Sequence, residues 1–200
     1  MERNGTLQSS REVRLTKRDY YEVGFRLLAD GGIGAVTIAN VCARLHVTKG
    51  SFYHHFENAP AFHRDLLDYY EDEYARRRID EVDAIDGTVE RLQGLLARGV
   101  DRDHEAESAL RAWSRTDPVA AEVMERVDAA RARYLVRFFV EAGLPRREAR
   151  VHADIALAII AGAQAMSPAT DRRKVRAMLE ANMRWTREAI EAANAPTPSA

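Results

Sequence analysis

Hydrophobic residues recur along most of this 200-residue chain at intervals of three or four positions, the spacing of one helical face. No segment alternates between apolar and polar residues as a strand does, and no internal repeat is visible. The pattern predicts an all-α fold of about nine helices. Their expected spans are about residues 16–30, 37–45, 48–56, 58–79, 86–100, 104–113, 117–142, 145–166 and 171–192.

Polar residues that favour helix starts precede several of these spans. Thr16 followed by Asp19 has the spacing of a capping box, in which hydroxyl and carboxylate satisfy first-turn amides. Thr37 and Thr48 are predicted N-caps of two short helices, and Asn58 is predicted to cap a longer one. Two short helices joined by a turn of three or four residues are typical of a helix-turn-helix motif.

The second short helix has an unusual concentration of polar groups. It reads Val47-Thr48-Lys49-Gly50-Ser51-Phe52-Tyr53-His54-His55-Phe56. A core helix rarely buries so many polar side chains, whereas a helix lying in the major groove of DNA can use nearly all of them. Phe52 and Phe56 are expected to face inward and fasten this helix to its domain.

Residues 16–66 resemble the N-terminal domain of the tetracycline-repressor (TetR) family of bacterial transcription regulators. The resemblance rests on the order of the helices, the Gly-containing turn, the Thr-started helix and the run 47–56. It implies an N-terminal helix-turn-helix domain and a C-terminal helical domain that binds an effector and dimerises. Two positions depart from the family pattern. His46 stands where a turn Gly is frequent, which predicts a different turn, and Ala59 replaces a phosphate-contacting Lys.

The candidate DNA contacts follow from the residue types in and before the second short helix. They are Thr37, Thr48, Lys49, Gly50, Ser51, Tyr53 and His54. Hydroxyls, a ring N–H and amides at helix starts suit phosphates, and Lys49 can reach a phosphate or a guanine edge. Gly50 lets backbone approach DNA. Because one such helix reads few base pairs, a dimer on an approximately palindromic operator is expected.

The segment from Ala156 to Ala165 is apolar almost all round, so it must be covered on every side. A second copy of the chain is the expected cover, and the alternative is a central helix within one protomer. The resemblance implies that the last two long helices form the dimer interface. The candidate interface residues are Ile155, Ala158, Ile159, Gly162, Met166 and Met183.

The resemblance also implies a small-molecule pocket among the C-terminal helices, whose occupation tilts the fourth helix and releases DNA. Its expected lining combines large apolar side chains with His152 and Gln164 as polar anchors. The other candidates are Tyr70, Tyr74, Trp113, Met124, Tyr134 and Phe138. Such a lining favours an apolar or aromatic effector, although aromatic residues at helical spacing also form ordinary core.

Charge and composition fit this interpretation. Lys and Arg outnumber Asp and Glu by three in residues 1–56, whereas the remainder carries four more acids than bases. The single cysteine, Cys42, excludes an internal disulfide and fits a reducing cytoplasm. No secretory signal or membrane span is apparent, so a cytoplasmic location without membrane contact is expected. The expected domains are a disordered tail (1–14), the DNA-binding domain (15–60), the effector and dimerisation domain (61–193), and a second disordered tail (194–200).

Other classes of function are less well supported by the sequence. His54, His55 and His63 lack metal-ligand spacing, and neither a phosphate-binding Gly loop nor a nucleophile elbow is present. Neither an enzyme nor a cofactor is therefore expected. A helical adaptor or ligand-binding protein without operator binding remains the alternative, and Ala59 favours it slightly. The sequence does not decide between repressor and activator, and only the family habit favours a repressor.

Overall fold

The computed structural model describes residues 15–166 and 171–195, apart from the side chain of Tyr74. The helices are α1 (Lys17–Gly31), α2 (Ile38–Leu45), α3 (Lys49–His55), α4 (Ala59–Tyr70), α5 (Arg77–Asp83), α6 (Thr88–Val100), α7 (His104–Ser114), α8 (Pro118–Glu141), α9 (Arg146–Met166) and α10 (Arg172–Ala193). A 3₁₀ turn, η1 (Ile33–Ala35), joins α1 to α2. Within these residues the fold is all-helical, as the sequence predicts.

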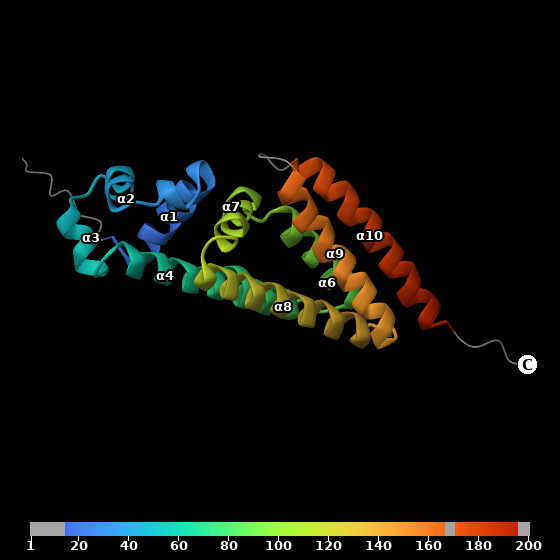
Figure 1. Cartoon of the computed structure of the whole chain (residues 1–200). Coiled ribbons are helices and arrows are strands. Elements are labelled where there is room, and N and C mark those ends of the chain that lie inside the picture. Colours follow the sequence, from blue (N-terminus) through green and yellow to red (C-terminus); the bar gives the residue numbers. More distant parts are fainter. Residues whose placement is uncertain (1–14, 167–170, 196–200) are drawn as a thin grey trace, which may run out of the picture.

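The segment from residue 59 to residue 83 runs as one continuous helix. A π-helical stretch, η2 (Glu71–Arg76), links α4 to α5, and the residues at both junctions keep right-handed helical angles. Counted this way, the described chain has nine α-helices, which confirms the expected number. Figure 1 shows α2 and α3 at one end of an elongated molecule, α9 and α10 at the other, and α4 and α8 extending between them.

Side-chain caps start the helices of the N-terminal domain as predicted. The Thr37 and Thr48 hydroxyls accept the amides three residues further on, at 3.2 and 3.3 Å, and the Asn58 side chain accepts at 2.8 Å. The amide and hydroxyl of Thr16 donate to the carboxylate of Asp19, at 2.6 and 2.8 Å. Local hydrogen bonds therefore fix the residues at which these helices begin.

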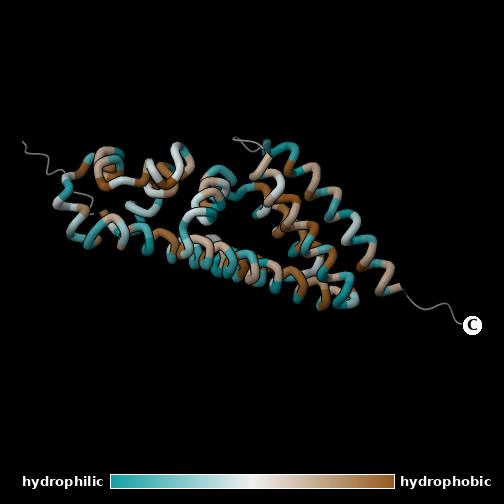
Figure 2. The backbone as a smooth tube through the Cα atoms, viewed as in Figure 1, coloured by the Kyte–Doolittle hydropathy of each residue, from teal (hydrophilic) through white to brown (hydrophobic). Residues whose placement is uncertain are grey.

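The hydrophobic core has one large cluster and two smaller ones. The large cluster joins α1–α4 to α7 and to the first half of α8. The smaller clusters lie among α6, α8, α9 and α10. Figure 2 shows hydrophobic and hydrophilic positions interleaved along the helices. No helix of the described residues is long and apolar enough to span a membrane.

The two predicted tails fall mainly on residues 1–14 and 196–200, which lie outside the described residues. Asn194 is described, and its amide group donates to the carbonyls of Ala142 and Ile190 at 2.9 Å each. The end of α10 is thereby fastened to the end of α8. The beginning of the predicted second tail accordingly has defined contacts.

Candidate nucleic-acid interface and effector cavity

The turn between α2 and α3 consists of His46, Val47 and Thr48. His46 adopts φ 56° and ψ 42°, and it is the one described non-glycine residue with positive φ. The amide of Val47 donates to the carbonyl of Cys42 at 3.0 Å, which closes the turn. Because this left-handed conformation favours glycine, His46 takes the backbone shape that a glycine would take more easily.

Aromatic packing fastens α3 to the rest of the domain. Phe52 is fully buried and Phe56 is 3% exposed, which confirms that both face inward. Tyr20 of α1 contacts both rings, with centroids 6.1 and 5.5 Å apart, and Phe56 also packs on Phe62 of α4 at 4.8 Å. Edge-to-face packing of this kind holds α3 rigidly against α1 and α4.

The opposite face of α3 and the starts of α2 and α3 are exposed to solvent. Tyr53 is 54% exposed, and Thr37, Thr48, Lys49, Gly50 and His54 are also exposed. Among the described residues Lys49 has no ion-pair partner, so its charge is available to a phosphate. A methyl group added at Gly50 would meet only the Thr48 hydroxyl, at 3.5 Å. This face can therefore approach another molecule closely.

Ser51 lies differently from the other six candidate DNA contacts. It is half-buried, and its hydroxyl lies 2.8 Å from the hydroxyl of Tyr20. The pair connects α3 to α1 within the domain. Ser51 therefore has a structural partner already, which the sequence pattern alone does not reveal.

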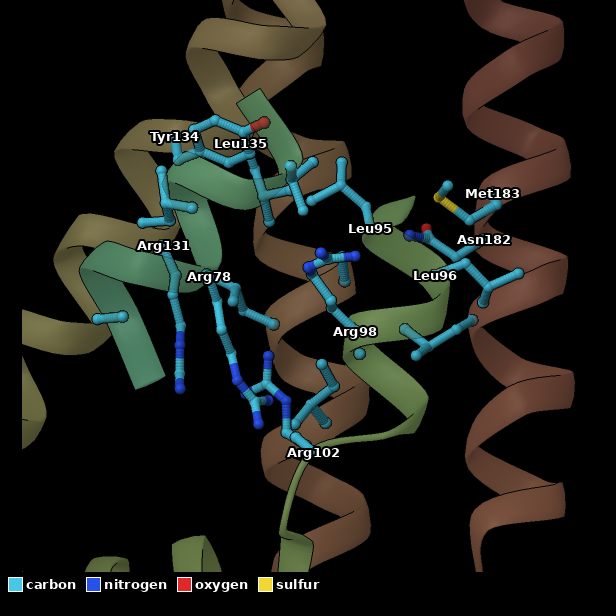
Figure 3. Close-up of a pocket in the computed structure, with 18 of the residues that line it drawn as sticks. Arg78, Leu95, Leu96, Arg98, Arg102, Arg131, Tyr134, Leu135, Asn182 and Met183 are labelled. Atoms are coloured by element: carbon cyan, nitrogen blue, oxygen red, sulfur yellow. The ribbon is translucent and has the colours of Figure 1, made fainter. Parts of the chain in front are cut away.

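An apolar cavity of about 100 Å³ opens among α5, α6, α8, α9 and α10 (Figure 3). Its lining includes Ala75, Arg78, Ile79, Val82, Leu95, Leu96, Arg98, Gly99, Arg102, Arg131, Tyr134, Leu135, Phe139, Ala156, Leu157, Ile160, Leu179, Asn182 and Met183. It lies at the end of the continuous helix α4–η2–α5, whose other end is in the N-terminal domain that contains α3.

Few of the residues predicted as the apolar lining of an effector site line this cavity. Tyr134 lines the cavity, but Tyr70, Trp113 and Met124 are buried in the large core cluster and Phe138 in a smaller one. The side chain of Tyr74 lies outside the described residues. These side chains recur at helical spacing because they pack against neighbouring helices, as ordinary core residues do.

The two expected polar anchors also lie elsewhere. The His152 ring nitrogen is 2.9 Å from the Thr186 hydroxyl, and this contact joins α9 to α10. Burial lowers the pKa of His152. Gln164 accepts from Arg111 at 3.1 Å, outside the cavity. Both side chains therefore have structural partners.

Sequence reasoning missed the polar side chains that do line the cavity. Arg98 and Arg102 come from the last turn of α6 and the residues after it, and Asn182 comes from α10. One signal was available. Asn182 occupies the buried stripe that contains Val175, Leu179 and Ile190, so an amide stands at a core position.

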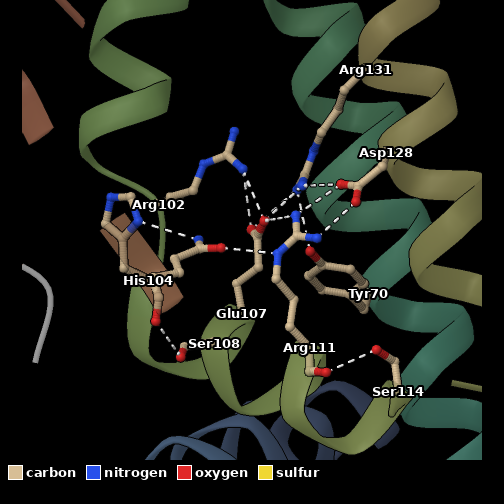
Figure 4. Close-up of polar contacts among 10 residues, drawn as sticks. Tyr70, Arg102, His104, Glu107, Ser108, Arg111, Ser114, Asp128 and Arg131 are labelled. Carbon is tan, nitrogen blue, oxygen red and sulfur yellow. Dashed lines mark hydrogen bonds and ion pairs between the residues drawn. The ribbon is translucent and has the colours of Figure 1, made fainter. Parts of the chain in front are cut away.

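An ionic cluster adjoins the cavity and connects it to α4 and α7 (Figure 4). The buried carboxylate of Glu107 accepts from Arg131 at 2.8 Å, from Arg102 at 3.1 Å and from Arg111 at 3.3 Å. Arg131 also donates to the hydroxyl of Tyr70, at 3.3 Å. Burial acts to raise the pKa of Glu107, but the guanidinium groups outweigh it and hold the pKa well below its usual range.

The candidate dimer residues fall into two groups. Ile155, Ala158 and Met166 are exposed on the outer face of α9, and a methyl group added at Gly162 would meet no atom of the protomer. Ile159 is half-buried against a small core cluster, and Met183 lines the cavity. Met183 therefore faces into the protomer. Because α9 keeps an exposed apolar face, it is not a central helix covered within one protomer.

Comparison with known proteins adds evidence about family and fold. A family model for bacterial regulatory proteins of the tetR family matches residues 21–58. The HTH-type transcriptional repressor KstR2 of Mycobacterium tuberculosis is 30% identical over 85 residues, which are 42% of this chain and 42% of KstR2. The match thus spans less than half of that relative.

Solved structures share the fold along most of the chain. A transcriptional regulator from Rhodococcus sp. Rha1 superposes with a TM-score of 0.70 at 17% identity, covering 92% of this chain and all of that one. AibR, solved with isovaleryl coenzyme A and operator DNA, gives a TM-score of 0.60 at 20% identity, covering 82% and 96% of the two chains. Residues 21–58 are thus similar to the N-terminal domain of bacterial regulatory proteins of the tetR family, and the chain shares its overall fold with solved transcriptional regulators.

Proposed function

We propose that this protein is a dimeric, sequence-specific DNA-binding regulator, most simply a repressor that a small molecule releases from a palindromic operator. The observation that carries the proposal is the two-sided character of α3. Its buried side is fastened by Phe52 and Phe56, while Lys49, Tyr53 and His54 are exposed on the helix. An exposed polar face on a rigidly held short helix fits the major groove.

The exposed groups divide into positioning and reading contacts. The Thr37 and Thr48 hydroxyls accept amides as caps, which leaves their O–H groups able to donate to phosphate oxygens. His54 offers a further ring N–H. Lys49 and Tyr53 project from the reading helix and can contact base edges or phosphates.

Dimerisation through α9 and α10 is supported by the exposed hydrophobic side chains there. Val151 (47% exposed), Ile155 (37%), Met166 (80%) and Trp185 (44%) all lie on these two helices. An apolar groove between α9 and α10 includes Ala158 and Gly162. Covering this surface with a second copy removes apolar area from water, and a two-fold pair then presents two copies of α3 to one duplex.

Effector control follows from the single helix that runs from the N-terminal domain to the cavity. A ligand that prefers one position of α5 also biases α4, because η2 joins them without a break. Trp113 of α7 contacts His63 of α4, with ring centroids 5.8 Å apart, and this contact transmits the same movement between the two helices. The ligand shifts DNA affinity only as far as it prefers one arrangement over the other.

The first test is DNA binding by Lys49→Ala and Tyr53→Ala, measured by fluorescence anisotropy on DNA flanking the gene. Each variant should lose affinity by about tenfold or more, because each removes a phosphate or base contact. Binding by the unaltered protein should weaken steeply with salt. Arg133→Ala, at an exposed position of α8, is the control and should bind normally. Unchanged affinity in both α3 variants would remove α3 as the reading helix.

The second test is Gly162→Leu, measured by sizing with light scattering. The added side chain meets open space within the protomer but obstructs a partner on α9, so the variant should become monomeric. Ala97→Leu, at an exposed position of α6, should remain dimeric. A Gly162→Leu protein that is still a dimer would place the interface elsewhere.

A further inference from the structure

Most of the unpaired buried polar atoms belong to residues that line the cavity. In the described part of the chain, the buried side-chain nitrogen and oxygen atoms without a hydrogen-bond partner are Arg98 Nε, Arg102 Nε, His104 Nε2, Tyr134 Oη, Asn182 Nδ2 and Asn182 Oδ1. All but the His104 atom belong to residues that line the cavity. Burying a polar group without a partner is unfavourable, so this concentration indicates a site that a ligand completes.

The charge of the lining has one sign. Arg78, Arg98, Arg102 and Arg131 line the cavity, and its described lining contains no Asp or Glu. Figure 3 shows the Arg78 and Arg102 side chains pointing toward one another at one end, with Arg98 reaching into the middle.

The acids that do pair with these arginines lie outside the cavity. Glu81 accepts from a terminal nitrogen of Arg98 at 3.0 Å, and Glu107 accepts from a terminal nitrogen of Arg102 at 3.1 Å. Both Nε–H groups remain unpaired. Burial lowers the pKa of Arg102, against the attraction of Glu107, while Arg131 and Arg78 lower it further. A further negative charge is therefore favoured at this end.

The rest of the wall is hydrocarbon. Leu95, Leu96, Leu135, Phe139, Leu157, Ile160 and Leu179 surround the cavity between the arginines and α10. Asn182 stands among them with both atoms of its amide unpaired, one a donor and one an acceptor. A ligand that fits this wall needs an apolar body.

We propose that the effector is a small organic acid, with its carboxylate between the Nε–H groups of Arg98 and Arg102 and its hydrocarbon body against the leucines. The proposal rests on the assignment of this cavity as the effector site. The volume of about 100 Å³ suits a body of a few carbons. Bound there, the carboxylate shares Arg102 with Glu107 and so weakens the ionic cluster that joins the cavity to α4 and α7.

The test is calorimetric titration of the full chain with hexanoate, hexanol and hexylamine, which share a hydrocarbon body and differ in charge. Hexanoate should bind at least about tenfold more tightly than the alcohol, and the amine should be rejected. Arg102→Met and Arg98→Met should each reduce hexanoate affinity by about tenfold and leave hexanol unchanged. Arg133→Met, at an exposed position of α8, is the matched control and should bind as the unaltered protein does.

Arg98→Met is the variant less expected to unfold the protein, because the ion pair that Arg98 forms among the described residues is with the half-exposed Glu81. Equal affinity for hexanoate and hexanol, insensitivity to both arginine variants, or no binding of hexanoate would each overturn the proposal. The proposed function fails by a different observation. If the protein binds hexanoate through these arginines but binds no duplex DNA, the ligand site is supported and the proposed regulator function is contradicted.

Discussion

The proposed DNA-reading end and the proposed effector end of this protein differ in how their buried polar groups are paired. In residues 15–70, as far as the structure describes them, every buried side-chain nitrogen and oxygen atom has a partner. Tyr20 contacts Ser51 at 2.8 Å, and the His63 ring lies 2.8 Å from the carbonyl of Val36. The cavity in the other half is lined by four residues with unpaired buried atoms.

The difference indicates that the N-terminal domain is built for rigidity and the cavity for binding. In the N-terminal domain, an aromatic core whose buried polar atoms all have partners holds α3 in one position. This suits a surface that must match DNA without rearranging. The cavity retains unpaired polar groups that reduce stability in the absence of a ligand, and such trade-offs mark functional sites. Three pairs of substitutions test this comparison.

The largest effect is expected from Glu107→Gln, which removes the acid that Arg102, Arg111 and Arg131 share. We expect the free energy of unfolding to fall by about 3 kcal/mol, because the substitution leaves buried guanidinium groups without their counter-charge. Urea denaturation followed by circular dichroism measures this loss. Glu125→Gln, at an exposed position of α8, should change stability by less than about 0.5 kcal/mol. Equal effects of the two variants would show that the cluster does not stabilise the fold.

A smaller effect of opposite sign is expected from Asn182→Leu. The substitution replaces an amide with no partners by an apolar side chain of similar size, so it should stabilise the ligand-free protein by about 1 kcal/mol.

Thr186→Val, one turn further along α10, is the matched contrast. The Thr186 hydroxyl contacts His152 and donates to the carbonyl of Asn182, each at 2.9 Å, so its removal should destabilise by about 1 kcal/mol. Thermal melts of the two variants should shift in opposite directions. Shifts of the same sign would contradict the view that Asn182 is an unsatisfied functional group.

The smallest effect is expected from His46→Gly in the N-terminal domain. Glycine tolerates the left-handed conformation of this turn, so stability should rise by a few tenths of a kcal/mol, up to about 1 kcal/mol. Gly32→Ala is the reverse test, because Gly32 has φ 68° and an added methyl group meets no atom there. It should lower stability by about 1 kcal/mol. Loss of stability in His46→Gly would show that the His46 side chain contributes to the turn.

The sequence was sufficient to predict features that depend on neighbours along the chain. The caps at Thr37, Thr48 and Asn58 need only an acceptor three residues before an amide. The inward positions of Phe52 and Phe56 follow from helical spacing and from the exposed groups around them. The helix count followed in the same way from periodicity.

The cavity was not predictable from the same information. Its wall combines faces of five helices that are distant in sequence, and periodicity does not say which faces meet. Trp113 and Met183 illustrate the problem, since both lie on helical stripes but one packs in the core and the other lines the cavity. The lining predicted from the sequence contained no arginine, whereas four arginines reach the cavity through their long side chains.

Footprinting of this protein on the DNA flanking its gene tests the central claim most directly. We expect two protected half-sites related by two-fold symmetry, with centres about one helical turn or slightly more apart, and loss of both in Lys49→Ala. A single unpaired footprint, or no protection by a folded dimer on any flanking DNA, would contradict the claim that two copies of α3 read one operator.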